Sequence, residues 1–212
     1  MFKLAPEGYP FIAVFGLLTF AALFLPGPFY PLFPAFLTLF MVWFFRDPER
    51  SVPQGKDLFV CPADGRIIVI RDVREDTYLH ADVLQVSIFM SPLDVHVNRV
   101  PCEGTVKTVQ HNKGRFLAAY KDEASIRNEN IEMVLETAYG DLLLRQVAGF
   151  VARRAVCRVA EGARLGRGER YGIIKFSSRV DIYLPKYVVI KVALDQVVKA
   201  GETVIAEYRK VC

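Results

Sequence analysis

Hydrophobic residues are concentrated near the N-terminus, in two runs that contain no charged side chain. The first is FIAVFGLLTFAALFL (11–25) and the second is FYPLFPAFLTLFMVWFF (29–45). The Pro-Gly-Pro segment 26–28 separates them, and a helix does not continue through such a sequence. Each run is at or below the length of about 20 residues that a membrane-spanning helix needs. The pattern predicts a membrane-associated helical hairpin over residues 1–46 that crosses a bilayer twice, or enters it deeply and returns.

Positive charge flanks this hairpin on both sides. Lys3 precedes the first apolar run, Arg46 and Arg50 follow the second, and the hinge between the two runs carries no charge. Positive residues favour the cytoplasmic side, so both ends and the downstream domain are expected in the cytoplasm, with the chain at the cell membrane. A cleaved signal peptide is disfavoured, since a second apolar run follows at once and no small-residue cleavage site separates the two. The alternative is a buried core hairpin of a soluble protein.

From residue 47 onward the pattern changes to short apolar or alternating runs separated by turn residues. Such spacing predicts a mostly antiparallel β domain over residues 47–212, and a mostly β (α+β) fold for the whole chain. Residues 118–130 are more polar and favour a helical turn or a mobile loop. The expected strands are 66–70, 84–90, 104–110, 131–137, 141–150, 172–176, 179–184 and 187–192.

Composition narrows the possible partners. The chain of 212 residues is 52% hydrophobic, and its formal net charge is +4. That charge suits an anionic membrane surface but is too small to indicate a nucleic-acid partner. The four cysteines and three histidines show no metal-ligand spacing, so no metal is expected, and the cysteines are interpreted as reduced, mostly buried thiols.

Two segments carry a candidate acid and a candidate base. Asp64 stands in CPADG, on a turn directly before a predicted strand, where an ordinary turn aspartate is the alternative interpretation. His96 stands in SPLDVHVNRVP, between an apolar strand and a proline-bounded segment. It is a candidate general acid or base, and a packed or capping histidine is the alternative.

A third segment, FSSR, carries a candidate nucleophile. Ser177 and Ser178 lie between two β-rich runs, and Asp181 follows closely. A serine becomes nucleophilic when a base that is itself oriented by an acid lies within hydrogen-bond reach. The G-x-S-x-G elbow is missing around Ser178, which disfavours an α/β-hydrolase.

Taken together, six segments in order resemble the short phosphatidylserine decarboxylases from about residue 5 to about residue 208. They are Asp47-Pro48, CPADGRI, SPLDVHVNRVP, NKGRF, QVAGFVARR and GERYGIIKFSSRVDIYLP. The resemblance implies a proenzyme that cuts itself between residues 177 and 178. Ser178 attacks the preceding carbonyl, the resulting ester is eliminated, and loss of ammonia leaves an N-terminal pyruvoyl group. The two chains, 1–177 and 178–212, stay associated.

The same resemblance implies the reaction. The pyruvoyl ketone forms a Schiff base with the amine of phosphatidylserine and accepts the electrons that remain when CO₂ leaves, the role that pyridoxal phosphate has elsewhere. The product is phosphatidylethanolamine, so the pathway is phospholipid biosynthesis. A homodimer is also expected from the resemblance.

Residue roles follow by position in these motifs. Asp64 corresponds to the acid that helps to activate the serine, and His96 to an active-site histidine that handles protons in decarboxylation. Larger members have a second histidine where this chain has Arg99, so a complete Asp-His-Ser triad is not implied. Either His96 serves both steps or another base such as His111 serves in self-cleavage, and His96 is favoured.

The residue before the reactive serine also departs from the family pattern. Members have glycine there, whereas this chain has Ser177. Glycine permits backbone geometries that a Cβ disfavours, and the acyl shift is expected to use a strained peptide. Ser177 is therefore expected to slow or stop maturation, and attack by Ser177 on Phe176 is the alternative cut.

Four basic residues, Lys113, Arg115, Arg153 and Arg154, are candidates to bind the phosphate and carboxylate of the lipid head group. Solvated surface charge is the alternative for each. Three rival functions stay open at this point. They are decarboxylation of an archaeal ether lipid of the archaetidylserine kind, an uncleaved inactive form, and a membrane-tethered biotinyl- or lipoyl-like module. The last is suggested by VALDQVVKAGETVIAEY (192–208), although that run lacks the usual modifiable lysine.

Overall fold

The computed structural model describes residues 3–114, 128–149, 154–176 and 178–209. The chain forms two compact units, residues 1–49 and 50–212, and each is described by itself. The division falls three residues beyond the predicted boundary at residue 46.

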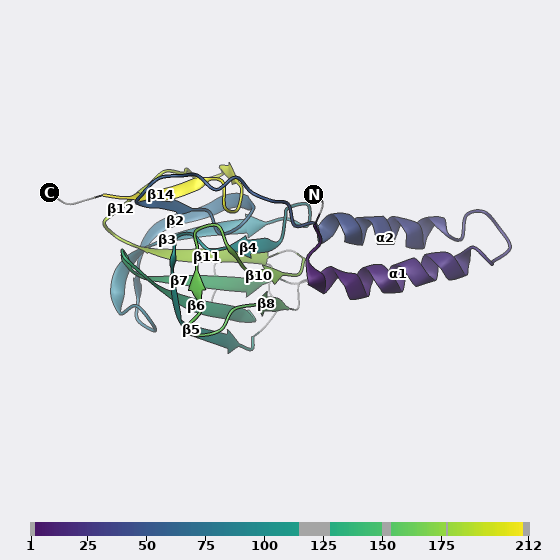
Figure 1. The fold of residues 1–212 in the computed structure, drawn as a ribbon, viewed down its shortest axis with the longest axis horizontal. Coiled ribbons are helices and arrows are strands. Elements are labelled where there is room, and N and C mark those ends of the chain that lie inside the picture. The colour runs from purple at the N-terminus through teal and green to yellow at the C-terminus, as the bar shows by residue number, and fades with distance from the viewer. Residues whose placement is uncertain (1–2, 115–127, 150–153, 177, 210–212) are drawn as a thin grey trace. The chain divides into compact units, whose positions relative to one another are not determined.

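The first unit is the predicted helical hairpin (Figure 1). A short 3-10 helix, Pro6–Gly8, leads into α1 (Tyr9–Ala22), and α2 (Leu32–Phe44) returns alongside it. The base is closed by backbone hydrogen bonds, from the Ala5 N–H to the Phe45 carbonyl and from the Asp47 N–H to the Lys3 carbonyl, both 2.8 Å. Among the described residues, neither helix combines the length and the hydropathy that crossing a membrane requires.

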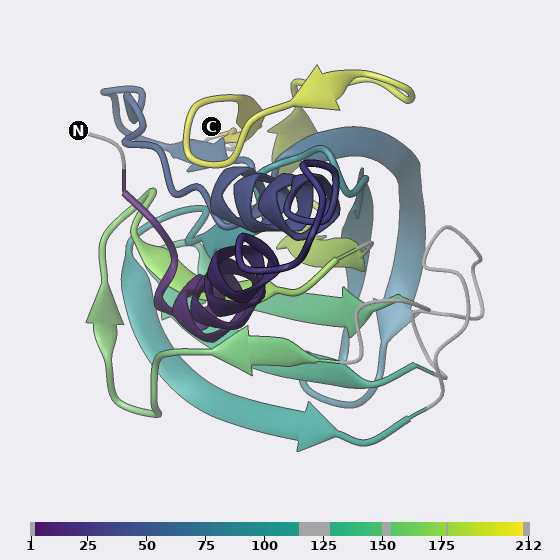
Figure 2. The ribbon, with the colours of Figure 1, turned by 90° about the vertical axis from the view of Figure 1, so that its right-hand side faces the viewer.

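The second unit is a β domain with one large sheet and two small ones, which confirms the predicted fold class. The large sheet is antiparallel, curls strongly (Figure 2) and has the strand order β13-β2-β3-β11-β7-β6-β5-β9. Its strands are β2 (Gly65–Glu75), β3 (Ala81–Met90), β5 (Gly104–Asn112), β6 (Asn130–Thr137), β7 (Gly140–Ala148), β9 (Arg164–Leu165), β11 (Ser178–Pro185) and β13 (Val197–Val198). One small sheet has the order β1-β14-β12, with β1 (Leu58–Val60), β12 (Val188–Ile190) and β14 (Val204–Tyr208). The other has the order β4-β10-β8, with β4 (Val97–Arg99), β8 (Ala155–Cys157) and β10 (Arg170–Ile174).

Strand β11 is central to the large sheet and is covered on both faces. Val180, Ile182 and Leu184 belong to the main hydrophobic core, on one side of the strand. Tyr183, on the other side, belongs to a second cluster with Val83. Because successive side chains point to opposite faces, residues of both parities are buried along this strand.

Six of the eight predicted strands correspond to the long strands β2, β3, β5, β6, β7 and β11, and the other two overlap the short strands β10 and β12. The short strands β1, β4, β8, β9, β13 and β14 were not predicted, since runs of two to five residues usually carry little periodicity. The predicted helical turn or loop over 118–130 lies mostly outside the described residues, and its last residue, Asn130, begins β6.

Candidate active site

The strand register brings Asp64 and Ser178 to the same end of the large sheet. Ser178 is the first residue of β11, and its Cα partners are Met90, the last residue of β3, and Ala148, the last residue of β7. On the other side of β3, strand β2 begins at Gly65, directly after Asp64. The acid and the candidate nucleophile are therefore separated by a single strand, although 113 positions lie between them in the sequence.

Gly65 allows this approach. Its φ is +146°, in the region that favours glycine, and a Cβ there would lie 2.1 Å from the carbonyl oxygen of Phe89. Glycine at position 65 therefore lets the chain directly after Asp64 approach the end of β3 more closely than any other residue would permit.

Strand β4 places His96 beside the segment that leads to Ser178. The Ile174 N–H donates to the His96 carbonyl at 3.3 Å, and Val97 pairs with Ile173 of β10. The ring Nδ1 of His96 lies 3.0 Å from the carbonyl oxygen of Asp94, and the side chain is fully buried. On the same strand, the Arg99 N–H donates to the Pro62 carbonyl at 2.9 Å, so β4 also contacts the segment that carries Asp64.

Ser178 is completely buried, and its hydroxyl donates to the sulfur of Met90 at 3.4 Å. The Asn98 amide donates to the same sulfur at 3.7 Å, and its oxygen accepts a hydrogen bond from Gln146 at 2.8 Å. A thioether is a weak acceptor that does not remove a proton. The serine is thus held in place without being deprotonated.

Two residues before Ser178, the backbone is strained. Phe176 has a φ of +65°, a left-handed conformation that costs a bulky residue on the order of 1–2 kcal/mol. Ser177, which the sequence predicts to stand at the cut, lies outside the described residues.

Asp64 has two partners that the sequence did not predict. Its Oδ2 accepts a hydrogen bond from Arg50 at 2.7 Å, and its Oδ1 accepts one from the Ala200 N–H at 2.8 Å. Burial raises the pKa of this carboxyl above its ordinary value, and the neighbouring Arg50 opposes that rise. Arg50 was considered in the sequence only as a flanking charge, because nothing local relates it to an acid fourteen positions away.

The remaining predicted residues are spread more widely. Arg99, which occupies the position of a second histidine, is buried and donates to the Gly168 carbonyl at 2.8 Å. His111 is exposed and lies 3.2 Å from a carboxylate oxygen of Glu129, on a strand three positions from β11 in the sheet order. That placement favours His96 over His111 as the base near Ser178.

Of the four predicted lipid-binding residues, two are described. Lys113 is exposed and directly follows β5, whose last residue lies at the Ser178 end of the sheet. Arg154 is exposed, and its carbonyl accepts a hydrogen bond from the Lys175 N–H at 3.1 Å, close to the segment before Ser178. Arg115 and Arg153 lie outside the described residues, so binding of the head group by these four stays a prediction.

The three cysteines that the structure describes are not candidates for the nucleophile. Burial raises the pKa of Cys61 and of Cys102 to about 12, and it raises that of Cys157 as well. These three are free thiols, protonated at neutral pH. In the part of the chain that the structure describes, no group of three histidine, cysteine or acidic side chains is arranged to hold a metal ion.

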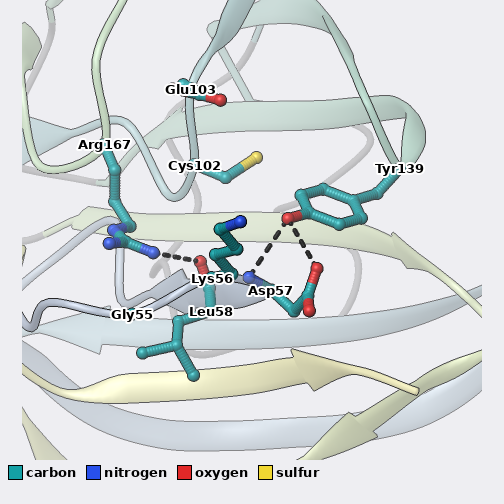
Figure 3. Close-up of a pocket in the computed structure, with 8 residues that line it drawn as sticks. All are labelled: Gly55, Lys56, Asp57, Leu58, Cys102, Glu103, Tyr139 and Arg167. Carbon is teal, nitrogen blue, oxygen red and sulfur yellow. Dashed lines mark hydrogen bonds between the residues drawn. The ribbon is translucent and has the colours of Figure 1, made fainter. Parts of the chain in front are cut away.

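A pocket of about 240 Å³ lies at the opposite end of the sheet (Figure 3). One lining residue, Tyr139, lies in the β6–β7 turn, whereas Ala148 beside Ser178 is at the opposite end of β7. The pocket is therefore far from Ser178. The Tyr139 hydroxyl donates to Asp57 at 2.9 Å, and Arg167 donates to the Leu58 carbonyl at 3.2 Å, so the polar groups bind one another. The pocket is not part of the candidate site. Its lining residues are Gly55, Lys56, Asp57, Leu58, Cys102, Glu103, Tyr139 and Arg167.

The fold places a buried serine at the start of a central strand, with Asp64 at the same end of the sheet and the His96 carbonyl bonded to the segment that leads to the serine. The family model described as phosphatidylserine decarboxylase matches residues 37–206. Relatives with the name phosphatidylserine decarboxylase proenzyme are 47% identical in Geobacter sulfurreducens, over 95% of each chain, and 43% identical in Syntrophus aciditrophicus, over 97% of each chain. Another in Aromatoleum aromaticum is 45% identical, over 96% of this chain and 95% of its own. The chain belongs to the phosphatidylserine decarboxylase family and is an enzyme of that class, which confirms the resemblance and disfavours the carrier-module alternative.

Proposed function

We propose that this chain converts phosphatidylserine to phosphatidylethanolamine, using a pyruvoyl group that it makes from Ser178 by cutting itself between residues 177 and 178. The observation that carries the proposal is the burial of Ser178. In the uncut chain this hydroxyl has no exposed surface and is not available to a substrate in solution, whereas the carbonyl of the preceding residue is covalently adjacent to it. The strained backbone at Phe176 supports the same interpretation, because strain is released when the peptide rearranges.

In the self-cleavage, the Ser178 Oγ forms a bond to the carbonyl carbon of Ser177, and the peptide C–N bond breaks. The Oγ proton must leave for this attack, and it passes to a base better than the Met90 sulfur. His96 is the proposed base, and Asp64, at the same end of the sheet, supplies negative charge that favours the protonated imidazole. Elimination of the ester then frees the carboxylate of Ser177, and hydrolysis releases ammonia and leaves the pyruvoyl group on residue 178.

The surroundings of Ser178 fit a small uncharged ketone. Its neighbours across the sheet are Met90 and Ala148, both buried and without charge, and the Asn98 amide donates to the same Met90 sulfur that the Ser178 hydroxyl contacts. The pyruvoyl group supplies a carbonyl that condenses with the substrate amine and accepts electrons during decarboxylation. In that reaction His96 is proposed to deliver the proton that replaces the lost carboxylate. The exposed Lys113 and Arg154 are proposed to bind the phosphate and carboxylate of the substrate.

Membrane association is part of the proposal. No charged residue occurs between Tyr9 and Phe45, and large apolar side chains on both helices are exposed, among them Leu17, Phe20 and Leu39. The hairpin is proposed to bind the cell membrane. The β domain is proposed to lie in the cytoplasm, because the positive charges Lys3 and Arg46 stand at the base of the hairpin. A homodimer, proposed from the family resemblance, is testable by light scattering in detergent.

Intact mass spectrometry tests the self-cleavage. Two species that divide the 24.0 kDa chain before Ser178, the smaller with a ketone in place of the terminal amine, are expected. Ser178→Ala should give a single uncut species, and Ser177→Gly should cut faster than the natural sequence. A chain that stays whole in both the natural and the Ser177→Gly forms, yet decarboxylates the lipid, would overturn the pyruvoyl proposal.

A further inference from the structure

Asp64 is held more firmly than an isolated turn aspartate. Both of its carboxylate oxygens have a donor, one from Arg50 and one from the Ala200 N–H. The exposed fraction of the side chain is 7% for Arg50 and 12% for Asp64, so water screens this ion pair only weakly. A contact of this kind has a strong influence on whether the carboxyl carries its charge.

Arg50 has a second, looser carboxylate partner. Its Nη1 lies 3.6 Å from Glu202, whose side chain is 30% exposed, whereas its Nη2 lies 2.7 Å from Asp64. The two acids therefore share one guanidinium. Glu202 and Ala200 stand in the same turn. That turn therefore supplies both the N–H that binds Asp64 and a second carboxylate that competes for Arg50.

We propose that Arg50 is a positioning residue that keeps Asp64 in its carboxylate form for self-cleavage, and that Glu202 weakens this effect by sharing Arg50. The inference rests on the proposed function, because it assigns Asp64 a charged role in the cut before Ser178. Arg50 does not touch the reacting atoms and acts through Asp64 alone.

The groups around Asp64 determine in which direction its pKa should shift when one of them is removed. Burial raises its pKa, Arg50 lowers it, and the Asp94 carboxylate raises it further. Arg99 borders the same turn, since a Cβ on Gly201 would lie 2.9 Å from its Cδ. The adjacent Cys61 is protonated and adds no charge. If the charged form of Asp64 is required, the rate of cleavage rises with pH through the pKa of Asp64.

The test is the pH profile of self-cleavage. The full chain is labelled in a short cell-free pulse, transferred to buffers of different pH in the presence of detergent, and followed by the appearance of the two fragments. Arg50→Gln removes the cation and is expected to move the midpoint up by about one pH unit or more, which slows cleavage about tenfold below the midpoint. Arg50→Lys, which keeps the charge, should move it less.

Glu202→Gln is expected to move the midpoint in the opposite direction, because it removes a negative charge and leaves Arg50 to Asp64 alone. Matched controls that lose the same charge at the far end of the sheet are Arg74→Gln and Glu136→Gln, which are 57% and 59% exposed. Both should keep the natural profile. Shifts of the same sign for Arg50→Gln and Glu202→Gln, or no shift in either, would overturn the inference.

A second measurement does not depend on cleavage. In uncut Ser178→Ala protein with ¹³C-labelled aspartate, the carboxyl signal of Asp64 is identified by its loss in Asp64→Asn and titrated by NMR. The titration should move up with Arg50→Gln and down with Glu202→Gln. If the titration moves as expected but the cleavage profile does not, Asp64 has no charged role in cleavage and the proposed function fails at that step. If the titration does not move, the inference about Arg50 fails on its own.

Discussion

The two units of this protein depart from the usual distribution of side chains in opposite directions. The hairpin exposes large apolar residues on both of its helices, with Leu17 and Leu39 each 69% exposed. The β domain instead buries charge, since Arg179 and Asp181 of β11 have no exposed surface and pair at 2.6 Å. Soluble domains rarely do either without a reason. The exposed apolar surface of the hairpin is what its proposed membrane binding would cover, whereas the β domain pairs the charges Arg179 and Asp181 that it encloses.

Removing one partner of the buried Arg179–Asp181 pair should have the largest effect on the stability of the β domain. Arg179→Leu removes the cation that pairs with the buried Asp181 carboxylate at 2.6 Å and is expected to lower the free energy of unfolding by about 3–5 kcal/mol. Urea unfolding at pH 7 in the uncut Ser178→Ala background measures the change. The double variant Arg179→Leu with Asp181→Leu should recover much of the loss. A double variant as unstable as the single one would show that packing, not charge pairing, is what matters at this position.

Charge placed on the hairpin should have the next largest effect, on membrane binding and not on folding. Leu17→Glu is expected to weaken binding to phospholipid vesicles by about 2–3 kcal/mol, the cost of a charged side chain at an apolar membrane position. Vesicle sedimentation measures it. Leu194→Glu, at a 58% exposed position of the β domain, is the control and should bind normally. Equal losses in both variants would contradict the division of roles between the units.

A buried carboxylate that is held mainly by backbone N–H groups, with a smaller contribution from the Arg145 charge, should have the smallest effect on stability. Glu75 accepts hydrogen bonds from the N–H groups of Thr77, Tyr78 and Leu79, at 3.1, 2.8 and 2.7 Å. Burial acts to raise its pKa, but these donors outweigh burial and lower it. Such a group stabilises the fold above its unfolded pKa, near 4.3, and the contribution is lost as pH falls through the lower folded value.

Glu75→Gln should therefore lower stability by about 1–2 kcal/mol at pH 7 and by less at pH 3. Urea midpoints of the variant and the natural sequence at the two pH values give the difference. An equal loss at both would mean that the charge of Glu75 contributes nothing to the turn.

The hairpin and the long strands were predictable because their signals are local. Two uncharged runs around Pro26 and Pro28 indicate the hairpin directly, and period-two runs indicate the strands. The strand order was not predictable, because it depends on pairing between distant segments. Ser178 meets Met90 and Ala148 only through that pairing.

The same holds for the candidate site: residues in local motifs were predictable, and contacts between distant segments were not. Asp64, His96 and Ser178 stood in recognisable motifs, and the structure places all three near one end of the sheet. Asn98 stands two positions after His96, in the short strand β4 that His96 precedes, and that spacing of two was the signal that could have indicated it. Arg50 had no such signal, because its contact with Asp64 depends on how the chain enters the β domain.

The position of Ser178 also determines what kind of complex self-cleavage would leave. A cut before this residue creates a chain end at the first position of a central strand, and the segment 178–209 contributes strands to two of the three sheets. The first strand of the shorter product would pair with β3 along its whole length and with β7 from Ser178 to Tyr183, and the product would also contribute the middle strand of the β1-β14-β12 sheet. Its release would require the sheets to open, so the lifetime of the two-chain enzyme would equal the unfolding time of the domain, independent of dilution.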